Sequence, residues 1–203
     1  MRRTLLLAVA ALAVAAAACG DADPASAPLT SESVDAPTTT IAPTVVSGRV
    51  LAEFAADDPS VGAEAPVAIG TDILTGETVS LAVADRPLAI AFFAHWCPHC
   101  QREVAELTEW LETNELPAGV DFAAVSTFVS SDRDNYPPEA WLEGEGWTYP
   151  IIGDTEGFSV AEAFGVTSIP FWVFVNADGT VAFRVPGNLG PDELANLFAG
   201  AAG

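Results

Sequence analysis

A short apolar run that leads directly into two cysteines, Cys97 and Cys100, constrains the fold of this chain most strongly. Residues 87–94 are apolar, rich in Ile and Phe and too few to span a membrane, which is typical of a buried strand. After the cysteines, apolar residues recur at helical spacing among glutamates from residue 104 to residue 111. The sequence therefore predicts a strand that turns into a helix at the cysteine pair.

Pro98 predicts that the helix begins at these cysteines, because a proline suits the first helical turn, where its missing N–H would have no partner. This places Cys97 at the helix N-terminus, where unpaired N–H groups and the helix dipole favour a negative charge. Such a position favours the thiolate, which is the reactive form of cysteine. We therefore expect Cys97 to be the attacking sulfur and Cys100 to be the more buried thiol that resolves a mixed disulfide.

The same cysteine pair could instead form a static disulfide or half of a metal site. A zinc site normally takes four ligands, and the sequence offers no second cysteine pair, with only His95 and His99 nearby. Thiol-disulfide exchange is therefore the favoured chemistry. It needs no metal and no cofactor beyond the redox-active disulfide of Cys97 and Cys100.

The first 18 residues have the composition of an export signal. Two arginines precede a run of Leu, Ala and Val that is too short for a comfortable membrane span. The run ends at Cys19 in a sequence that resembles a bacterial lipobox, although Ala16 stands where leucine is usual. We predict a signal peptide over 1–18 and a lipidated Cys19 that anchors the protein to the outer face of the bacterial cell membrane. Ordinary signal cleavage, which would release a secreted protein, is the alternative.

Residues 19–47 are predicted to form a disordered tether, because Asp, Ala, Pro, Ser and Thr dominate them with almost no aromatic or aliphatic clustering. The folded domain is then expected over 48–203. The formal net charge of −21 and the absence of lysine argue against binding to nucleic acid and against adsorption to anionic lipid. The acidic excess is typical of general solubility in an exported protein.

The folded part of the chain alternates between strand and helix patterns. Residues 45–56 could be either a short helix or a strand. Beyond them we expect an extended lead-in at 61–66, a hairpin over 72–81 that turns at Thr75–Gly76, strands at 121–127, 149–152, 171–175 and 180–185, and helices at 138–145, 158–164 and 191–199. Strands alternating with helices, followed by a terminal hairpin and helix, predict an α/β sandwich.

These motifs resemble the thioredoxin superfamily, and within it the TlpA/ResA-like membrane-anchored thiol-disulfide oxidoreductases of bacteria. The resemblance covers about residues 61–199. It is carried by the lead-in, the hairpin, the Phe-Phe-Ala-x-Trp-Cys-x-x-Cys strand and helix, an inserted strand and helix after Thr127, and the segment 165–170. It implies a thioredoxin-like α/β fold with a central mixed sheet, an N-terminal β-hairpin and an inserted βα element.

The resemblance also implies roles for residues outside the cysteine pair. Ile169 and Pro170 would be joined by a cis peptide that faces the cysteines, so that Ile169 presents its backbone to an extended client segment. Trp96 would pack beside the disulfide. Glu103 matches a glutamate that ResA-like proteins hold near the cysteines, where we expect it to move protons to or from Cys100. The alternative is a solvated helix glutamate.

His99 makes the direction of electron flow an open question. The Pro98-His99 pair is also found in the oxidant DsbA and suggests an oxidising poise, whereas ResA-like relatives usually reduce. We expect His99 to tune the reactivity of Cys97, with simple capping of the helix as the alternative. His95 is expected at the edge of the groove rather than as a catalytic base.

The favoured function is an extracytoplasmic protein thiol-disulfide oxidoreductase whose clients are exported proteins with thiols or disulfides, and which exchanges electrons with a membrane redox partner. A peroxiredoxin-like peroxidase is a second enzyme hypothesis, although His95-Trp96 does not supply the Thr or Ser and Pro that such enzymes place ahead of their cysteine. A copper-binding chaperone is the non-enzymatic hypothesis. It would need a third ligand, and no histidine follows His99. Client identity and oligomeric state are not encoded in any motif of this chain.

Overall fold

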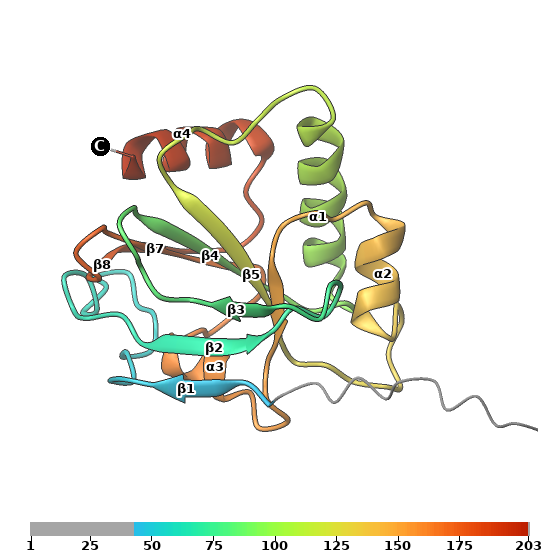
Figure 1. Cartoon of the computed structure of the whole chain (residues 1–203), viewed down its shortest axis with the longest axis horizontal. Coiled ribbons are helices and arrows are strands. Elements are labelled where there is room, and N and C mark those ends of the chain that lie inside the picture. Colours follow the sequence, from blue (N-terminus) through green and yellow to red (C-terminus); the bar gives the residue numbers. More distant parts are fainter. Residues whose placement is uncertain (1–42, 203) are drawn as a thin grey trace, which may run out of the picture. The chain divides into compact units, whose positions relative to one another are not determined.

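The computed structural model describes residues 43–202 of the chain. Its strands are β1 (Val45–Ser47), β2 (Val67–Thr71), β3 (Thr78–Ser80), β4 (Leu88–Phe93), β5 (Asp121–Ser126), β6 (Ile151–Gly153), β7 (Phe171–Val175) and β8 (Val181–Pro186). Its helices are α1 (Pro98–Leu111), α2 (Pro138–Gly144), α3 (Ser159–Ala163) and α4 (Pro191–Ala201). The strands form a five-stranded sheet in the order β6-β5-β4-β7-β8 and a three-stranded sheet in the order β1-β2-β3 (Figure 1). The predicted α/β class is confirmed.

The five-stranded sheet is mixed, as the resemblance implied. Its central strand β4 runs parallel to β5 and antiparallel to β7. Every residue of β4 is buried, which explains why its sequence is continuously apolar rather than alternating. Because β4 and β5 are parallel and β7 is antiparallel, β4 and β5 end at the same edge of the sheet at which β7 begins. The cysteine pair follows β4 at this edge.

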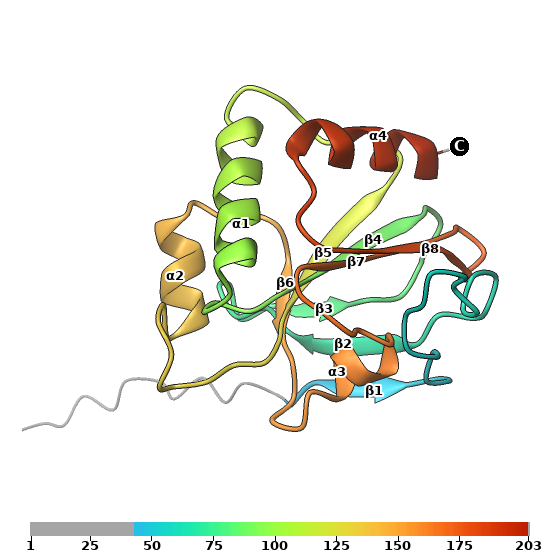
Figure 2. The same cartoon turned by 180° about the vertical axis from the view of Figure 1, so that it is seen from behind.

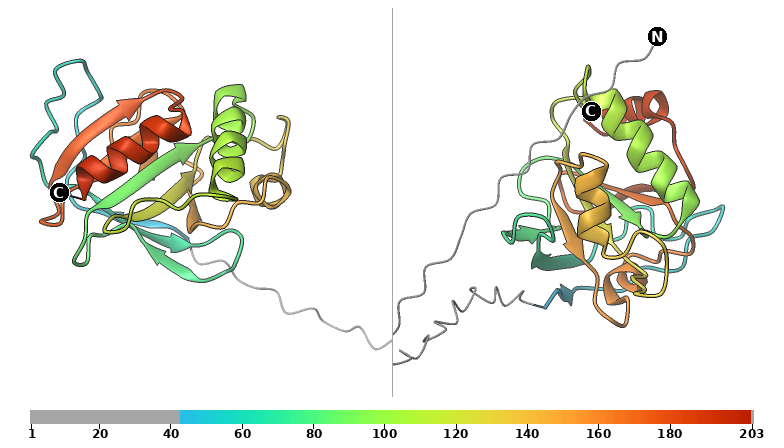
Figure 3. Two further views of the ribbon diagram at one scale, coloured as in Figure 1. Left: turned by 90° about the horizontal axis from the view of Figure 1, so that it is seen from above. Right: turned by 90° about the vertical axis from the view of Figure 1, so that its right-hand side faces the viewer.

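Side chains of β4 alternate between two hydrophobic cores. Ala89, Ala91 and Phe93 belong to the core that includes α1, α2 and α4. Ile90 and Phe92 belong to the core that includes α3 and the three-stranded sheet. Figures 2 and 3 show α1 and α4 on one face of the five-stranded sheet, and Figure 2 shows α3 and the small sheet on the other. The helix that follows the cysteines, α1, thus packs on one face of the buried sheet.

An aromatic cluster fills the core under α1. Trp172 of β7 stacks on Phe122 with ring centroids 5.5 Å apart and meets Phe93 edge to face at 5.9 Å. Phe198 of α4 contacts the Trp172 ring edge to face at 6.3 Å. Aromatic pairs in such geometries each contribute about 0.5–1.5 kcal/mol beyond their buried area. The Trp172 indole is therefore fixed in place beneath the helix that carries the cysteines.

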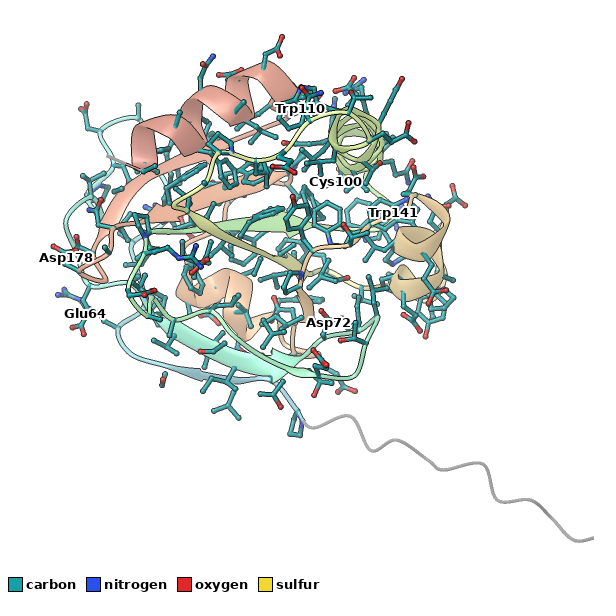
Figure 4. All side chains as sticks on the ribbon, turned by 45° about the horizontal axis from the view of Figure 1, so that its top comes forward. Glu64, Asp72, Cys100, Trp110, Trp141 and Asp178 are labelled. Atoms are coloured by element: carbon teal, nitrogen blue, oxygen red, sulfur yellow. The ribbon has the colours of Figure 1, made fainter. Side chains whose placement is uncertain are left out.

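The predicted hairpin forms, but its first strand lies earlier than expected. The sequence predicts a hairpin that starts at residue 72, whereas β2 ends at Thr71 and Asp72 begins the turn. The Asp72 carboxylate accepts hydrogen bonds from the N–H groups of Leu74 and Thr75, which is a side-chain turn that competes with strand pairing. Its other oxygen accepts the Ile151 N–H and so ties the turn to β6 (Figure 4).

The folded domain begins before residue 48, where the sequence placed its start. Residues Val45–Ser47, assigned to the tether, form β1 and pair with β2, since two consecutive valines favour a strand. The predicted signal peptide, Cys19 and the tether up to residue 42 lie outside the described residues. Within residues 43–202, no helix is long and apolar enough to cross a membrane.

Candidate active site

The cysteine pair lies where β4 gives way to α1, as predicted. Cys97 is the N-cap of α1 with an extended backbone, and Pro98 occupies the first helical turn. The Cys97 N–H donates to the Ala94 carbonyl at 3.0 Å, and the Cys97 carbonyl accepts the Gln101 N–H at 3.0 Å. The chain therefore turns sharply and starts the helix at Cys97. This exposes the Cys97 side chain to the unpaired N–H groups of the helix N-terminus.

The two thiols differ in burial. Both are free, with Cys97 6% exposed and Cys100 0% exposed. The Ala94 N–H points at the Cys100 sulfur at 3.5 Å. Burial raises the pKa of Cys100 well above its usual value, and the nearby Cys97 and Glu103 add to this. Cys97 is thus the less buried of the two thiols, and burial favours the protonated form of Cys100.

The loop before β7 faces the cysteines. The Ile169–Pro170 peptide is cis, which confirms the expectation drawn from the resemblance. The half-buried Ile169 places its carbonyl oxygen 3.8 Å from the Cys97 sulfur, within reach of the S–H. The Pro170 carbonyl accepts the Gly187 N–H at 2.8 Å, which fixes the loop to the end of β8. A second cis peptide, Tyr136–Pro137, was not predicted.

A buried arginine holds the base of this loop, and sequence reasoning missed it. The Arg184 guanidinium forms an ion pair with Asp58 and donates to the carbonyls of Ala52 and Phe164, the latter at 2.8 Å. The hydrogen bond from Arg184 lowers the pKa of Asp58. The glycine next to this arginine is also constrained: Gly165 has a φ of 66°, and a Cβ there would lie 2.3 Å from the Ala52 carbonyl oxygen, so glycine is required. The sequence signal that could have revealed this buried ion pair is the single arginine within the apolar run of β8.

Glu103 is a buried acid, so the alternative of a solvated helix glutamate is wrong. Its side chain is 0% exposed, because it lies one turn after Cys100 on the face of α1 that packs on the sheet. One carboxylate oxygen accepts the Trp172 indole N–H at 2.7 Å and the Leu189 N–H at 3.3 Å, and the other accepts the Asn188 amide at 3.3 Å. Burial outweighs these bonds and raises the pKa of Glu103 to about 7. A carboxyl group of this kind can exchange a proton near neutral pH.

His99 connects to Glu103 through a chain of polar side chains. It is exposed on the first turn of α1, and its Nδ1 accepts a hydrogen bond from Arg102, because a guanidinium can only donate. Arg102 also donates to the Asn188 oxygen at 3.2 Å, and Asn188 donates to Glu103. The N-cap residue Cys97 makes no side-chain cap bond, and the bond printed for the His99 ring runs to the Arg102 side chain.

Trp96 and His95 lie just ahead of Cys97 and differ in exposure. Trp96 is half-buried against the core that contains both cysteines, as the resemblance implied. Its indole N–H donates to the Phe128 carbonyl at 2.7 Å, and the Arg133 guanidinium lies 4.7 Å from the centroid of its ring. His95 is not at a groove edge: it is fully buried, because both ring nitrogens bond to backbone groups of the loop after β5.

A third metal ligand does not converge on the cysteines. Within the described part of the chain, no group of three or more His, Cys, Asp and Glu side chains is arranged to hold a metal ion. The copper-binding hypothesis therefore gains no support from the site.

Comparison with known proteins identifies the family to which this sequence is similar. The family model described as AhpC/TSA family matches residues 61–184. The chain is 25% identical to the thiol-disulfide oxidoreductase ResA of Halalkalibacterium halodurans over 109 residues, which is 53% of this chain and 58% of that protein. It is also 25% identical to ResA of Geobacillus thermodenitrificans over 135 residues, or 66% of this chain and 74% of that protein.

A solved structure supports the same fold. The structure of MTB DsbF in its mixed oxidized and reduced forms superposes with a TM-score of 0.52 and 26% identity, over 63% of this chain and 90% of that one. The AhpC/TSA match spans more than half of the chain, and it contains the strand, the cysteine pair and the cis-proline loop described above. The chain therefore belongs to the AhpC/TSA family and is a TlpA/ResA-like member of the thioredoxin superfamily.

Proposed function

We propose that this protein is a thiol-disulfide oxidoreductase that works through Cys97 and Cys100. The observation that carries the proposal is the pairing of Cys97, the less buried thiol, at a helix N-terminus with the fully buried Cys100 one turn later. The Ile169 carbonyl faces Cys97. The names of its ResA relatives and the two redox forms of DsbF support the same chemistry.

Exchange proceeds in two balanced steps when the protein acts as a reductase. The Cys97 thiolate attacks a client disulfide, one client sulfur leaves as a thiol after taking up a proton, and a mixed disulfide forms at Cys97. Cys100 then loses its proton and attacks the Cys97 sulfur, which releases the second client thiol. Two electrons pass to the client and a Cys97–Cys100 disulfide remains. Oxidation of client thiols is the same sequence in reverse.

The second step needs a base, because burial keeps Cys100 protonated. Glu103 is the group placed to take this proton: it is buried one helical turn from Cys100, and its pKa is raised to about 7. Asn188 bonds to the Glu103 carboxylate and is itself exposed, so solvent, which must finally take the proton, lies one side chain away from Glu103. His99, at the solvent side of the same chain, would tune Cys97 and the redox poise.

The client would bind as an extended segment against the backbone of Ile169, with Trp96 and Pro170 shaping the groove. We assign these clients to exported proteins and the protein to the outer face of the cell membrane, held by a lipid on Cys19 and a tether. A membrane redox partner would reset the cysteine pair after each turnover.

A peroxiredoxin-like peroxidase is less well supported by the residues of this site. His95 and Trp96, which precede the reactive cysteine, are engaged with the loop after β5 and offer no hydroxyl to a peroxide. Peroxide consumption that requires Cys97 and proceeds faster than disulfide exchange would favour the peroxidase.

The decisive experiment measures insulin reduction and thiol-peptide oxidation with wild type, Cys97→Ser and Cys100→Ser. We expect Cys97→Ser to abolish both activities, and Cys100→Ser to accumulate a mixed disulfide with the client at Cys97. The exposed variant Asn176→Ala in the β7–β8 turn serves as a control and should behave as wild type. Activity that survives Cys97→Ser would refute the proposal.

A further inference from the structure

The two residues that precede Cys97 hold a loop that the exchange mechanism does not use. This loop, residues 128–136, connects β5 to α2, and we refer to it as the β5–α2 loop. The His95 ring donates from Nδ1 to the Asp134 carbonyl at 2.6 Å and accepts the Ser130 N–H at Nε2 at 3.2 Å. The His95 carbonyl accepts the amides of Gln101 at 2.8 Å and Asn135 at 3.3 Å. His95 thus bonds to the loop with both its ring and its backbone.

The partners of His95 determine its protonation state. A backbone carbonyl only accepts and a backbone N–H only donates, so Nδ1 carries the hydrogen and Nε2 presents its lone pair. The imidazole is therefore neutral, in one tautomer, and both of its polar atoms are used. An asparagine or glutamine side chain could replace only one of these two bonds, and a leucine neither.

These contacts involve the two residues of the loop whose backbone conformation is least common. Two of its residues lie in the left-handed region without being glycine: Phe128 at a φ of 50° and Asn135 at 61°. Each is bonded to the dipeptide before Cys97, since the Phe128 carbonyl accepts the Trp96 indole N–H and the Asn135 amide donates to the His95 carbonyl. Residues in sparsely populated backbone regions persist where the surroundings over-determine them, and they are frequent at functional sites.

The sheet topology places this loop on one side of the cysteines and the cis-proline loop on the other. β5 and β7 are the two neighbours of β4 in the sheet. The end of β5 and the start of β7 both lie at the edge where Cys97 follows β4. The segment ending at Pro170 approaches Cys97 from the β7 side, and the β5–α2 loop contacts Trp96 from the β5 side.

We propose that His95 is a positioning residue that holds the β5–α2 loop as the second wall of the client site, opposite the cis-proline loop. The inference rests on the proposed exchange function and adds a determinant of client binding to it. Because His95 touches no reacting atom, its loss affects extended protein clients, which need both walls, more than it affects small disulfides, which need only Cys97.

The test compares a peptide disulfide client with glutathione disulfide, using wild type, His95→Leu, His95→Gln and His95→Asn. We expect His95→Leu to raise KM for the peptide about tenfold, the effect of losing two buried hydrogen bonds that preorganise the wall, and to change the rate with glutathione disulfide far less. His95→Gln and His95→Asn each keep one partner and should recover part of the lost affinity. Hydrogen exchange of residues 128–136 should rise in the same order.

A second variant keeps the inference testable if His95→Leu does not fold. Asn135→Ala removes the bond to the His95 carbonyl, and the residue type that tolerates the left-handed backbone at this position, from the exposed side of the loop. It should raise the peptide KM by a smaller factor, whereas Asn176→Ala, at an exposed asparagine of the β7–β8 turn, should not. An unchanged peptide KM in folded His95→Leu, or in Asn135→Ala where His95→Leu does not fold, would overturn the proposal, as would equal losses with both disulfides. If wild type exchanges neither disulfide, the proposed function fails, while the hydrogen-exchange comparison still decides whether His95 holds the loop.

Discussion

Two groups of residues around the start of α1, an outer rim and an inner cluster, place the two cysteines in different surroundings. The outer rim consists of Cys97, His99 and Arg102, and the latter two side chains are exposed. The inner cluster consists of Cys100, Glu103 and Trp172, all 0% exposed. The contrast shows that the neighbours of each thiol differ: exposed side chains follow Cys97 on the helix, whereas fully buried ones surround Cys100. At the inner cluster burial raises the pKa of both Cys100 and Glu103.

Removing the acid of the inner cluster should give the largest effect on turnover. We expect Glu103→Gln to slow resolution of the mixed disulfide by roughly 100-fold, the lower end of the range for general acid–base groups. The wild-type rate should also rise with pH through about 7, as Glu103 ionises and becomes able to accept a proton, and this rise should vanish in the variant. Stopped-flow decay of a preformed mixed disulfide between pH 5 and 9 measures both.

Glu109→Gln, at an exposed position farther along the same helix, is the matched control. If both variants lose the same rate, or if the pH dependence persists in Glu103→Gln, the buried carboxyl is not the base.

Glu103→Gln should also change how the free energy of unfolding depends on pH. The folded-state pKa of Glu103 is raised from 4.5 to about 7, so the folded state binds more protons than the unfolded state between these values. Wild type should therefore lose about 3 kcal/mol of unfolding free energy between pH 4.5 and pH 7, relative to Glu103→Gln, with little further loss above it. Urea denaturation of both proteins at pH 5 and 8 tests this, and parallel pH curves would contradict it.

At the outer rim, His99→Pro should change the reduction potential of the Cys97/Cys100 couple and leave thiol-disulfide exchange itself intact. A proline at this position would suit the start of a helix, so the variant should fold, but it removes the imidazole that bonds to Arg102. We expect the reduction potential of the Cys97/Cys100 couple to become more reducing by roughly 30 mV, a tenfold change in the equilibrium constant. Equilibration with glutathione measures it. An unmoved potential would leave His99 without a tuning role.

The smallest effect is expected where the two regions meet. Asn188→Ala removes one of the hydrogen bonds that favour ionised Glu103, so it should move the midpoint of the pH–rate profile upward without abolishing the rise. The variant should otherwise turn over at nearly the wild-type rate. A downward shift of the midpoint would show that Asn188 does not stabilise the carboxylate.

Local patterns predicted most of the helices and strands, and they predicted the part of the site that contains the cysteine pair. The apolar run of β4 and the helical spacing after Pro98 located the cysteine pair at a helix N-terminus, because both signals act within a few residues. The start of the hairpin was misplaced because the Asp72 carboxylate forms a side-chain turn. Residues 45–47 stayed open between helix and strand because the β1 strand depends on its pairing with β2.

Contacts between residues far apart in the chain account for the remainder. His95 and Glu103 resemble surface residues in the sequence, yet their partners Ser130, Asp134 and Trp172 lie 35 to 69 residues away. Arg184 has its carboxylate partner 126 residues away, at Asp58. No pattern within one segment reveals such partners, because burial of a polar group is decided by what the fold brings to it.

The amino-acid sequence was enough to place two cysteines at a helix N-terminus after a buried strand, and to assign a proline segment near residue 170 to the same site. Short-range sterics and backbone hydrogen bonding suffice for the first of these, and a family pattern for the second. It took the folded arrangement to establish that Cys100 and Glu103 are fully buried while Cys97 is slightly exposed, and that the His95 ring bonds to the β5–α2 loop. Desolvation and hydrogen-bond pairing depend on neighbours that the whole sheet assembles, so they exist only once the chain has folded.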